Sequence, residues 1–93
     1  TELYKLPAEE IDYEIEWTVL GLLRQFYTLK ERDIISKLGA GEYALLHLPN
    51  EWHSIIKEAI TIRKGEKMNN FTSDKERIDM TIRFSKYIIH FLY

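Results

Sequence analysis

The segment PAEEIDYEIEWTVLGLLRQFYTL, residues 7–29, carries the clearest structural signal in this chain. Its apolar residues recur at spacings of three and four, which places them on one face of an α-helix. Pro7 suits a first helical position, and the acidic residues that follow it favour the positive end of the helix dipole. We therefore predict a long amphipathic helix from Pro7 to about Leu29. Its core-facing stripe comprises Ile11, Ile15, Val19, Leu22, Leu23 and Phe26.

Three shorter helices are predicted after it. Residues 37–48 form the second, with Ser36 as its N-cap and Pro49 at its end. The third covers residues 49–64, and Gly65 stops it. Residues 66–72 are polar and predict a loop.

The last helix begins at a capping box made by Ser73 and Glu76. Its wide apolar face implies deep burial against the other helices. No strand-like alternation competes with these assignments. The predicted fold class is therefore all-α, a single compact bundle of about four to five helices over residues 1–93.

Composition excludes several classes of function. The 93 residues suit one domain, and 45% hydrophobic and 30% charged residues are ordinary for a globular protein. A net charge of −2 argues against non-specific nucleic-acid binding, because neutralising phosphates needs a basic excess. Cysteine is absent, and no apolar stretch is long enough to cross a membrane. We expect a cytoplasmic protein with no nucleic-acid or membrane partner, and the start at Thr1 without methionine indicates a piece of a longer chain.

A second stripe runs along the first predicted helix beside the core stripe. One interpretation is a wall that faces a ligand or another domain, because aromatic rings stack on ligands and a guanidinium matches a phosphate. The other is that these residues fill the bundle core while the arginine extends its charge to solvent. The stripe comprises Tyr13, Trp17, Leu20, Arg24 and Tyr27.

Other charged residues also have two explanations. Lys37 stands at the start of the second helix, where free amides and an ammonium group suit an anion, but a solvated lysine explains it too. Arg63 stands at the end of the third helix, where a cation also satisfies the dipole. An acidic cluster at the start of the first helix either receives a polycationic ligand or forms a solvated end. It comprises Glu9, Glu10, Asp12, Glu14 and Glu16.

Catalytic arrangements are missing from the sequence, so no catalytic or metal-ligating residue is predicted in this chain. His47, His53 and His90 show no metal-ligand spacing. Gly39-Ala40-Gly41 lacks the downstream Gly-Lys-Ser/Thr of a P-loop. Arg83 and His90 resemble the Arg-x(4–6)-His signature of the helical HEPN ribonucleases. This leaves an alternative hypothesis, a stand-alone HEPN-like module with ribonuclease or toxin activity, or one that binds a separate nucleotidyltransferase.

An ordered set of short matches runs through the middle of the chain. Gly41-Glu42-Tyr43-Ala44-Leu45 and Leu48-Pro49 stand at its centre, preceded by Arg24 and Ile35-Ser36-Lys37 and followed by Arg63-Lys64-Gly65. In this order they resemble the helical C-terminal domain of the aminoglycoside (spectinomycin/streptomycin, 3''/9-type) adenylyltransferases. The resemblance covers roughly residues 6–93.

The resemblance implies a division of labour between two domains. In that family an N-terminal nucleotidyltransferase domain, which would precede this chain, carries the catalytic base and the carboxylates that bind Mg²⁺. The helical domain closes over ATP and the drug. The family's phosphate-contacting Arg and Lys fall on Arg24 and Lys37. Arg63 stands where some members have Tyr, and we expect it to reach the phosphates as well.

The same resemblance nominates residues for the drug. The family's drug-binding acidic position falls on Glu14, with Asp12 and Glu16 beside it, and Trp17 is a wall of the pocket by position. The expected function is transfer of AMP from Mg-ATP to a hydroxyl of an aminoglycoside or aminocyclitol antibiotic. This chain alone is expected to be inactive.

Overall fold

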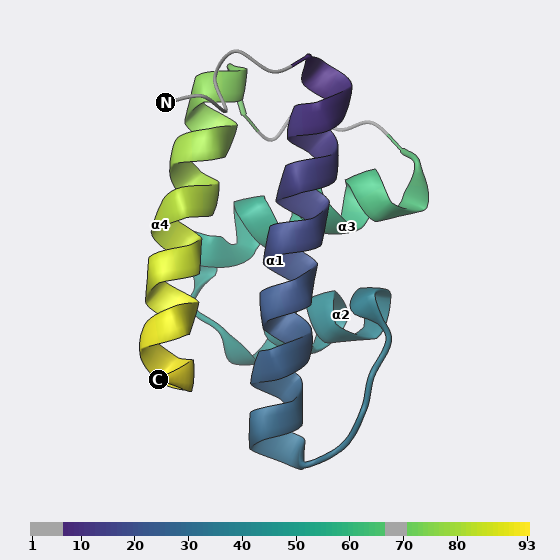
Figure 1. Ribbon diagram of the computed structural model, residues 1–93, viewed down its shortest axis with the longest axis vertical. Helices are drawn as coiled ribbons and strands as arrows, with labels where there is room; N and C mark the ends of the chain where they lie inside the picture. The colour runs from purple at the N-terminus through teal and green to yellow at the C-terminus, as the bar shows by residue number, and fades with distance from the viewer. Residues whose placement is uncertain (1–6, 67–70) are drawn as a thin grey trace.

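The computed structural model describes residues 7–66 and 71–93, and within them every regular element is helical. α1 and α4 run side by side in the same direction, α3 crosses behind them, and α2 lies against the second half of α1 (Figure 1). The predicted all-α bundle is confirmed. Its elements are α1 (Ala8–Glu31), α2 (Lys37–His47), the 3-10 turn η2 (Asn50–Trp52), α3 (His53–Lys64) and α4 (Asp74–Leu92).

Side chains cap two helices at the predicted positions. Ser36 Oγ accepts a hydrogen bond from the Gly39 N–H at 3.0 Å, and Ser73 Oγ accepts one from the Glu76 N–H at 3.2 Å. Each bond satisfies one of the amides that the first turn of a helix leaves without a partner. The Glu76 carboxylate accepts from Thr72 Oγ1 at 2.8 Å, so it also holds the residue before the cap.

The end of the first helix and the start of the third differ from the prediction, and part of the predicted loop lies outside the described residues. α1 continues past Leu29 to Glu31 and ends at Arg32, which takes a left-handed conformation with φ 56°. No glycine marks this end, so the predicted boundary at Leu29 was too early. The third helix starts with η2 before α3, and Gly65 ends it with φ 76° as predicted. Residues 67–70 of the predicted 66–72 loop lie outside the described residues.

The core forms where the inner face of α1 meets the other three helices. The predicted stripe is buried from Ile11 to Phe26 except for Leu22, which is half-buried against it. α2 approaches closely at Gly41, where a Cβ atom would lie only 2.8 Å from Ile60 Cγ1 and 3.2 Å from Leu20 Cδ2. Glycine at this position therefore lets the start of α2 lie tightly against α1 and α3.

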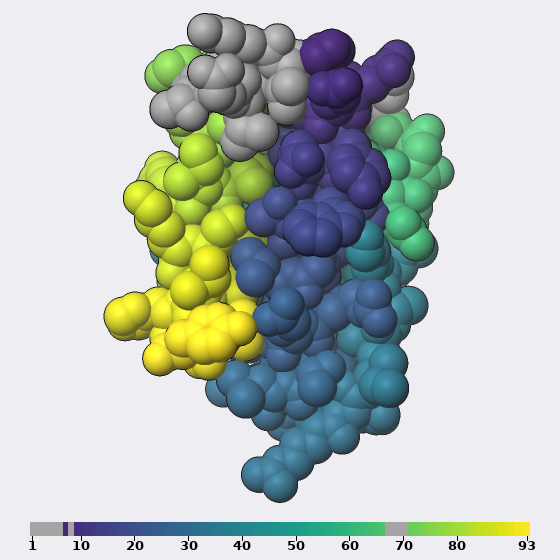
Figure 2. Space-filling model, in the orientation of Figure 1, coloured from purple at the N-terminus to yellow at the C-terminus, as the bar shows by residue number. Residues whose placement is uncertain are grey.

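The outer face of α1 is left at the surface. Figure 2 shows it as a strip running between α4 on one side and the residues of α2 and α3 on the other. No helix in the described ranges is long and apolar enough to cross a membrane. The helix that organises the core thus also presents side chains to whatever lies outside the bundle.

Candidate functional site

A buried carboxylate joins α1, α2 and α3. Glu16 on α1 is only 6% exposed. Its Oε1 lies 3.5 Å from Lys37 Nζ on α2 and 3.2 Å from Arg63 Nη1 on α3. A buried charge is costly unless it is paired, and here two cations share one oxygen. The structure thus brings Lys37 and Arg63 together around Glu16.

Arg24 is held close to the same end of α2. Its Nε donates to the Ile35 carbonyl oxygen at 3.0 Å, and Thr28 Oγ1 donates to the Asp33 carbonyl oxygen at 2.9 Å. Both bonds tie α1 to the segment that leads into α2. A guanidinium has five N–H donors, so the bond to Ile35 occupies only one of them. Among residues 7–66 and 71–93 the exposed Arg24 guanidinium makes no ion pair.

Arg24 and Lys37 line one open hollow of about 250 Å³, which we call the basic hollow. Trp17 also lines it, and no carboxylate does. Such a surface attracts anions, and a guanidinium with an ammonium group matches the oxygens of a phosphate. Its other lining residues are Thr18, Gly21, Leu22 and Gln25.

A second hollow, of about 290 Å³, lies beyond Glu16, and we call it the acidic hollow. Three carboxylates and one guanidinium line it, so its local charge is opposite to that of the basic hollow. The Lys37–Glu16 ion pair marks the place where the two meet, because each partner lines one of them. The acidic hollow is lined by Glu9, Asp12, Tyr13, Glu16, Ile62 and Arg63.

The second stripe of α1 divides between the core and the surface. Leu20 is fully buried and Tyr27 is half-buried, which fits the core interpretation for these two residues. Tyr13 and Trp17 are 62% and 57% exposed, so that interpretation is wrong for them. Each hollow therefore has one solvent-exposed aromatic side chain in its lining.

Glu14 lies apart from both hollows. It is exposed and lines a narrow crevice between α1 and α4 together with Thr18, Thr81 and Ile82. Two residues along an α-helix turn the side chain by about 200°. Glu14 and Glu16 therefore face nearly opposite sides of α1, and the structure does not bring the predicted acidic group together as one cluster.

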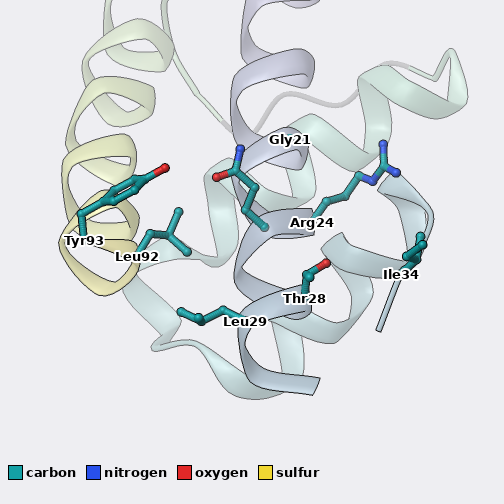
Figure 3. A pocket seen from close by; sticks show the side chains of 8 residues that line it. Gly21, Arg24, Thr28, Leu29, Ile34, Leu92 and Tyr93 are labelled. Carbon is teal, nitrogen blue, oxygen red and sulfur yellow. The ribbon is translucent and has the colours of Figure 1, made fainter. Parts of the chain in front are cut away.

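Arg24 also borders a larger groove of about 600 Å³ at the end of the bundle. In Figure 3 its guanidinium extends toward the segment that precedes α2, away from Leu92 and Tyr93 at the end of α4. Leu29 and the exposed Ile34 add to the apolar part of this groove. Arg24 is the one charged residue in its lining.

Arg77 is a largely buried charged residue, with its side chain 12% exposed, that the sequence analysis missed. Its Nε lies 2.9 Å from Glu58 Oε2 on α3, its Nη1 lies 2.9 Å from Asp74 Oδ1, and its Nη2 is paired with Asp12 on α1. Burial alone would lower the pKa of Arg77, but the bonds to Asp12 and Asp74 and the charge of Glu58 raise it above its ordinary value. Asp12 is thus already engaged by a cation of its own chain.

A spacing signal could have revealed both buried charges. Glu16 lies three residues before the buried Val19, which lies four residues before the buried Leu23, so it falls on the same face of α1. Arg77 precedes the buried residues Thr81 and Phe84 in the same way, at an interval of four. A charged residue in register with a buried stripe predicts a buried ion pair.

The histidines and the residues of the HEPN resemblance lie elsewhere. His47 stacks on Tyr43 with ring centroids 4.0 Å apart, and His53 Nε2 lies 3.0 Å from the Leu48 carbonyl oxygen. Arg83 and His90 are both exposed on α4. Among residues 7–66 and 71–93, no group of three or more His, Asp or Glu side chains could hold a metal ion.

The fold and the two hollows define an all-α domain with a surface of divided charge. Residues 3–87 match the family described as aminoglycoside adenylyltransferase, C-terminal domain. Because the match covers nearly the whole chain, the chain belongs to this family. Searches of the curated proteins and of the solved structures give no match. The predicted family is confirmed, while the roles of individual residues toward ATP and drug stay predictions.

Proposed function

We propose that this chain is the helical part of an enzyme that transfers AMP from Mg-ATP to a hydroxyl group of an aminoglycoside or aminocyclitol. Arg24 and Lys37 contact the ATP phosphates, and Arg63 assists them from α3. The drug lies against the acidic hollow, which Asp12 and Glu16 line, and extends to the exposed ring of Trp17 at the edge of the basic hollow. ATP is the donor, so the reaction belongs to the cytoplasm.

One observation carries the proposal: two hollows of opposite charge lie next to each other and meet at the Lys37–Glu16 pair. Transfer of AMP needs a polyanionic nucleotide and a polycationic drug bound side by side. A basic surface attracts the first and an acidic surface attracts the second. An arrangement with a single charge sign would repel one of the two substrates.

The size of the hollows supports a shared site. At about 250 and 290 Å³, each is at or below the small end of the range for complete small-molecule pockets, roughly 300–1,000 Å³. Neither could enclose ATP or an aminoglycoside by itself. We infer that an N-terminal nucleotidyltransferase domain covers the outer face of α1, including the exposed Tyr13 and Trp17. That domain would also hold Mg²⁺, which supplies charge neutralisation on the phosphates.

The role of the basic hollow follows from the charge that the reaction develops. When the drug hydroxyl attacks the α-phosphorus, the bond to the bridging oxygen breaks and pyrophosphate leaves with its negative charge. Fixed cations next to the β- and γ-phosphates stabilise that charge without having to reorganise. Arg24, fixed by its bond to Ile35, and Lys37, fixed by its pair with Glu16, are suited to this role.

Glu14 has a separate place in the proposal. It matches the family's drug-binding acidic position but faces the crevice toward α4. A drug large enough to reach over the outer face of α1 would meet Glu14 on one side and the acidic hollow on the other. Trp17, whose side chain is exposed between these two sides, would contact its rings.

The test uses the full-length protein that contains this domain. Pyrophosphate release is measured with spectinomycin and with streptomycin as acceptors. Arg24→Ala and Lys37→Ala should each lower kcat/KM by about 100-fold or more, as removal of a charge-stabilising donor does. Arg83→Ala and Lys57→Ala remove matched exposed cations from α4 and α3 and should leave kcat/KM within about twofold.

Circular dichroism establishes that each variant is folded before its rates are compared. Arg24→Lys provides a second variant, because it keeps a positive charge if loss of the Ile35 bond alone disturbs the loop. Wild-type turnover in both alanine variants would overturn the proposed phosphate role. The HEPN-like alternative instead predicts ribonuclease activity that Arg83→Ala and His90→Ala abolish.

A further inference from the structure

Glu16 is an unexpected residue beside a phosphate-binding surface. A carboxylate there competes with the nucleotide for the same two cations, and its burial adds a desolvation cost. A neutral side chain would avoid both penalties. Lys37 and Arg63 nevertheless both pair with the Oε1 atom of Glu16. The two cations belong to different helices and line different hollows.

We propose that Glu16 is a positioning residue for the transfer reaction. It holds the Lys37 ammonium and the Arg63 guanidinium at one fixed point between the two substrates, and it limits the net positive charge that the polyphosphate meets. This inference rests on the proposed function of Arg24 and Lys37. It assigns Glu16 an action through the two cations, in addition to the charge that it contributes to the acidic hollow.

The positioning effect follows from the flexibility of lysine. Lys37 stands at the first position of α2, and a lysine side chain has a long, rotatable stem with a compact charge at its end. The pair with Glu16 selects one arrangement of that stem before ATP arrives. Catalysis depends on such preorganisation, because a charge that must first be oriented contributes less to the transition state.

The charge-limiting effect follows from simple addition. Arg24, Lys37 and Arg63 contribute three positive charges, and Glu16 reduces their sum to two. Without that carboxylate, ATP and the departing pyrophosphate would both be held more tightly. Binding that is stronger in the ground state lowers KM but does not raise kcat, and tightly held pyrophosphate leaves slowly.

Glu16→Gln in the full-length protein separates these effects, since it keeps the size and removes the charge. Removing a unit charge about 6 Å from a phosphate changes its affinity about tenfold at an effective dielectric constant of ~40. At saturating drug we expect about a tenfold lower KM for ATP and a similarly lower inhibition constant for pyrophosphate. We also expect kcat to fall by about tenfold or more.

A matched control removes a carboxylate from the solvent face of α2. Glu42 is exposed and forms no ion pair with Lys37 or Arg63 in the part of the chain that the structure describes, so Glu42→Gln should leave KM and kcat within about twofold. Glu16→Asp keeps the charge but shortens the side chain. It should keep KM for ATP near the wild-type value while lowering kcat, and it serves as the deciding variant if Glu16→Gln does not fold.

The outcomes distinguish this inference from the proposed function. If Arg24→Ala and Lys37→Ala turn over normally, the phosphate role itself fails. If those two variants lose activity while Glu16→Gln has unchanged KM, kcat and pyrophosphate inhibition, only the positioning role is overturned. A purely structural Glu16 would give that second result, with reduced thermal stability as its one effect.

Discussion

Removing the Arg77 side chain should be among the most damaging single changes in this domain. Arg77 is 12% exposed and pairs with Glu58, whose side chain is 7% exposed, at 2.9 Å. It also holds Asp12 of α1 and Asp74 of α4. Arg77→Met keeps much of the apolar stem but leaves the Glu58 carboxylate buried without this cation.

The expected cost is large relative to the whole stability of the fold. Breaking a buried pair by removing one partner costs about 3–5 kcal/mol. A chain of 93 residues has roughly 5–14 kcal/mol of stability in total. At about 4–8 °C per kcal/mol for a domain of this size, Tm should fall by roughly 12–40 °C.

Urea unfolding of the chain, followed by far-UV circular dichroism at pH 7, measures this cost. Lys75→Met removes a surface pair with Asp79 on the same helix and should cost less than about 0.5 kcal/mol. The double variant Arg77→Met/Glu58→Gln should be more stable than Arg77→Met, because the buried carboxylate charge that Arg77 neutralised is gone. A cost below about 1 kcal/mol for Arg77→Met, or no recovery in the double variant, would show that the Arg77–Glu58 pair contributes little to stability.

Three further predictions concern single residues. The phenol of Tyr43 donates to Glu31 Oε2 at 2.6 Å, and this bond raises the pKa of Tyr43 to about 12 from the ordinary 10.0. The contribution of this bond to stability is present below pH 10 and is lost as the pH rises to 12. In an ultraviolet titration, Glu31→Gln should return the pKa of the late-titrating tyrosine toward 10. An unchanged titration curve would contradict this. Gly21→Ala should stabilise the chain by about 0.5–1 kcal/mol because a Cβ meets nothing within 4 Å. Gly41→Ala should destabilise it by about 1–2 kcal/mol through overlap at α3, and equal thermal shifts for the two would show that packing at Gly41 is loose.

The helices were predictable because local chemistry marks most of their ends. Ser36, Ser73 and Gly65 each provide a cap whose mechanism does not depend on tertiary contacts. The end of α1 was missed because Arg32 adopts the left-handed conformation there, a role usually taken by glycine. Periodicity likewise predicted the core stripe of α1, since a long helix must bury one face.

The sequence nominated candidate site residues but did not predict how they are arranged. The resemblance selected Arg24 and Lys37, and the structure places both in one hollow. That Glu16 turns inward toward Lys37 and Arg63 while Glu14 turns outward depends on how α2 and α3 pack against α1. Crossing geometry between helices is set by long-range packing, which a single sequence does not reveal.

The two-sidedness of α1 has a consequence for how such enzymes diversify. Its inward residues contact the other three helices, so exchanging one of them disturbs the whole bundle. Tyr13 and Trp17 point outward, and their replacement leaves the interior untouched. Under the proposed function, substitutions at these outward positions can change the acceptor preference with little loss of folding stability. We therefore expect altered resistance spectra to arise from substitutions on this face sooner than from changes in the interior.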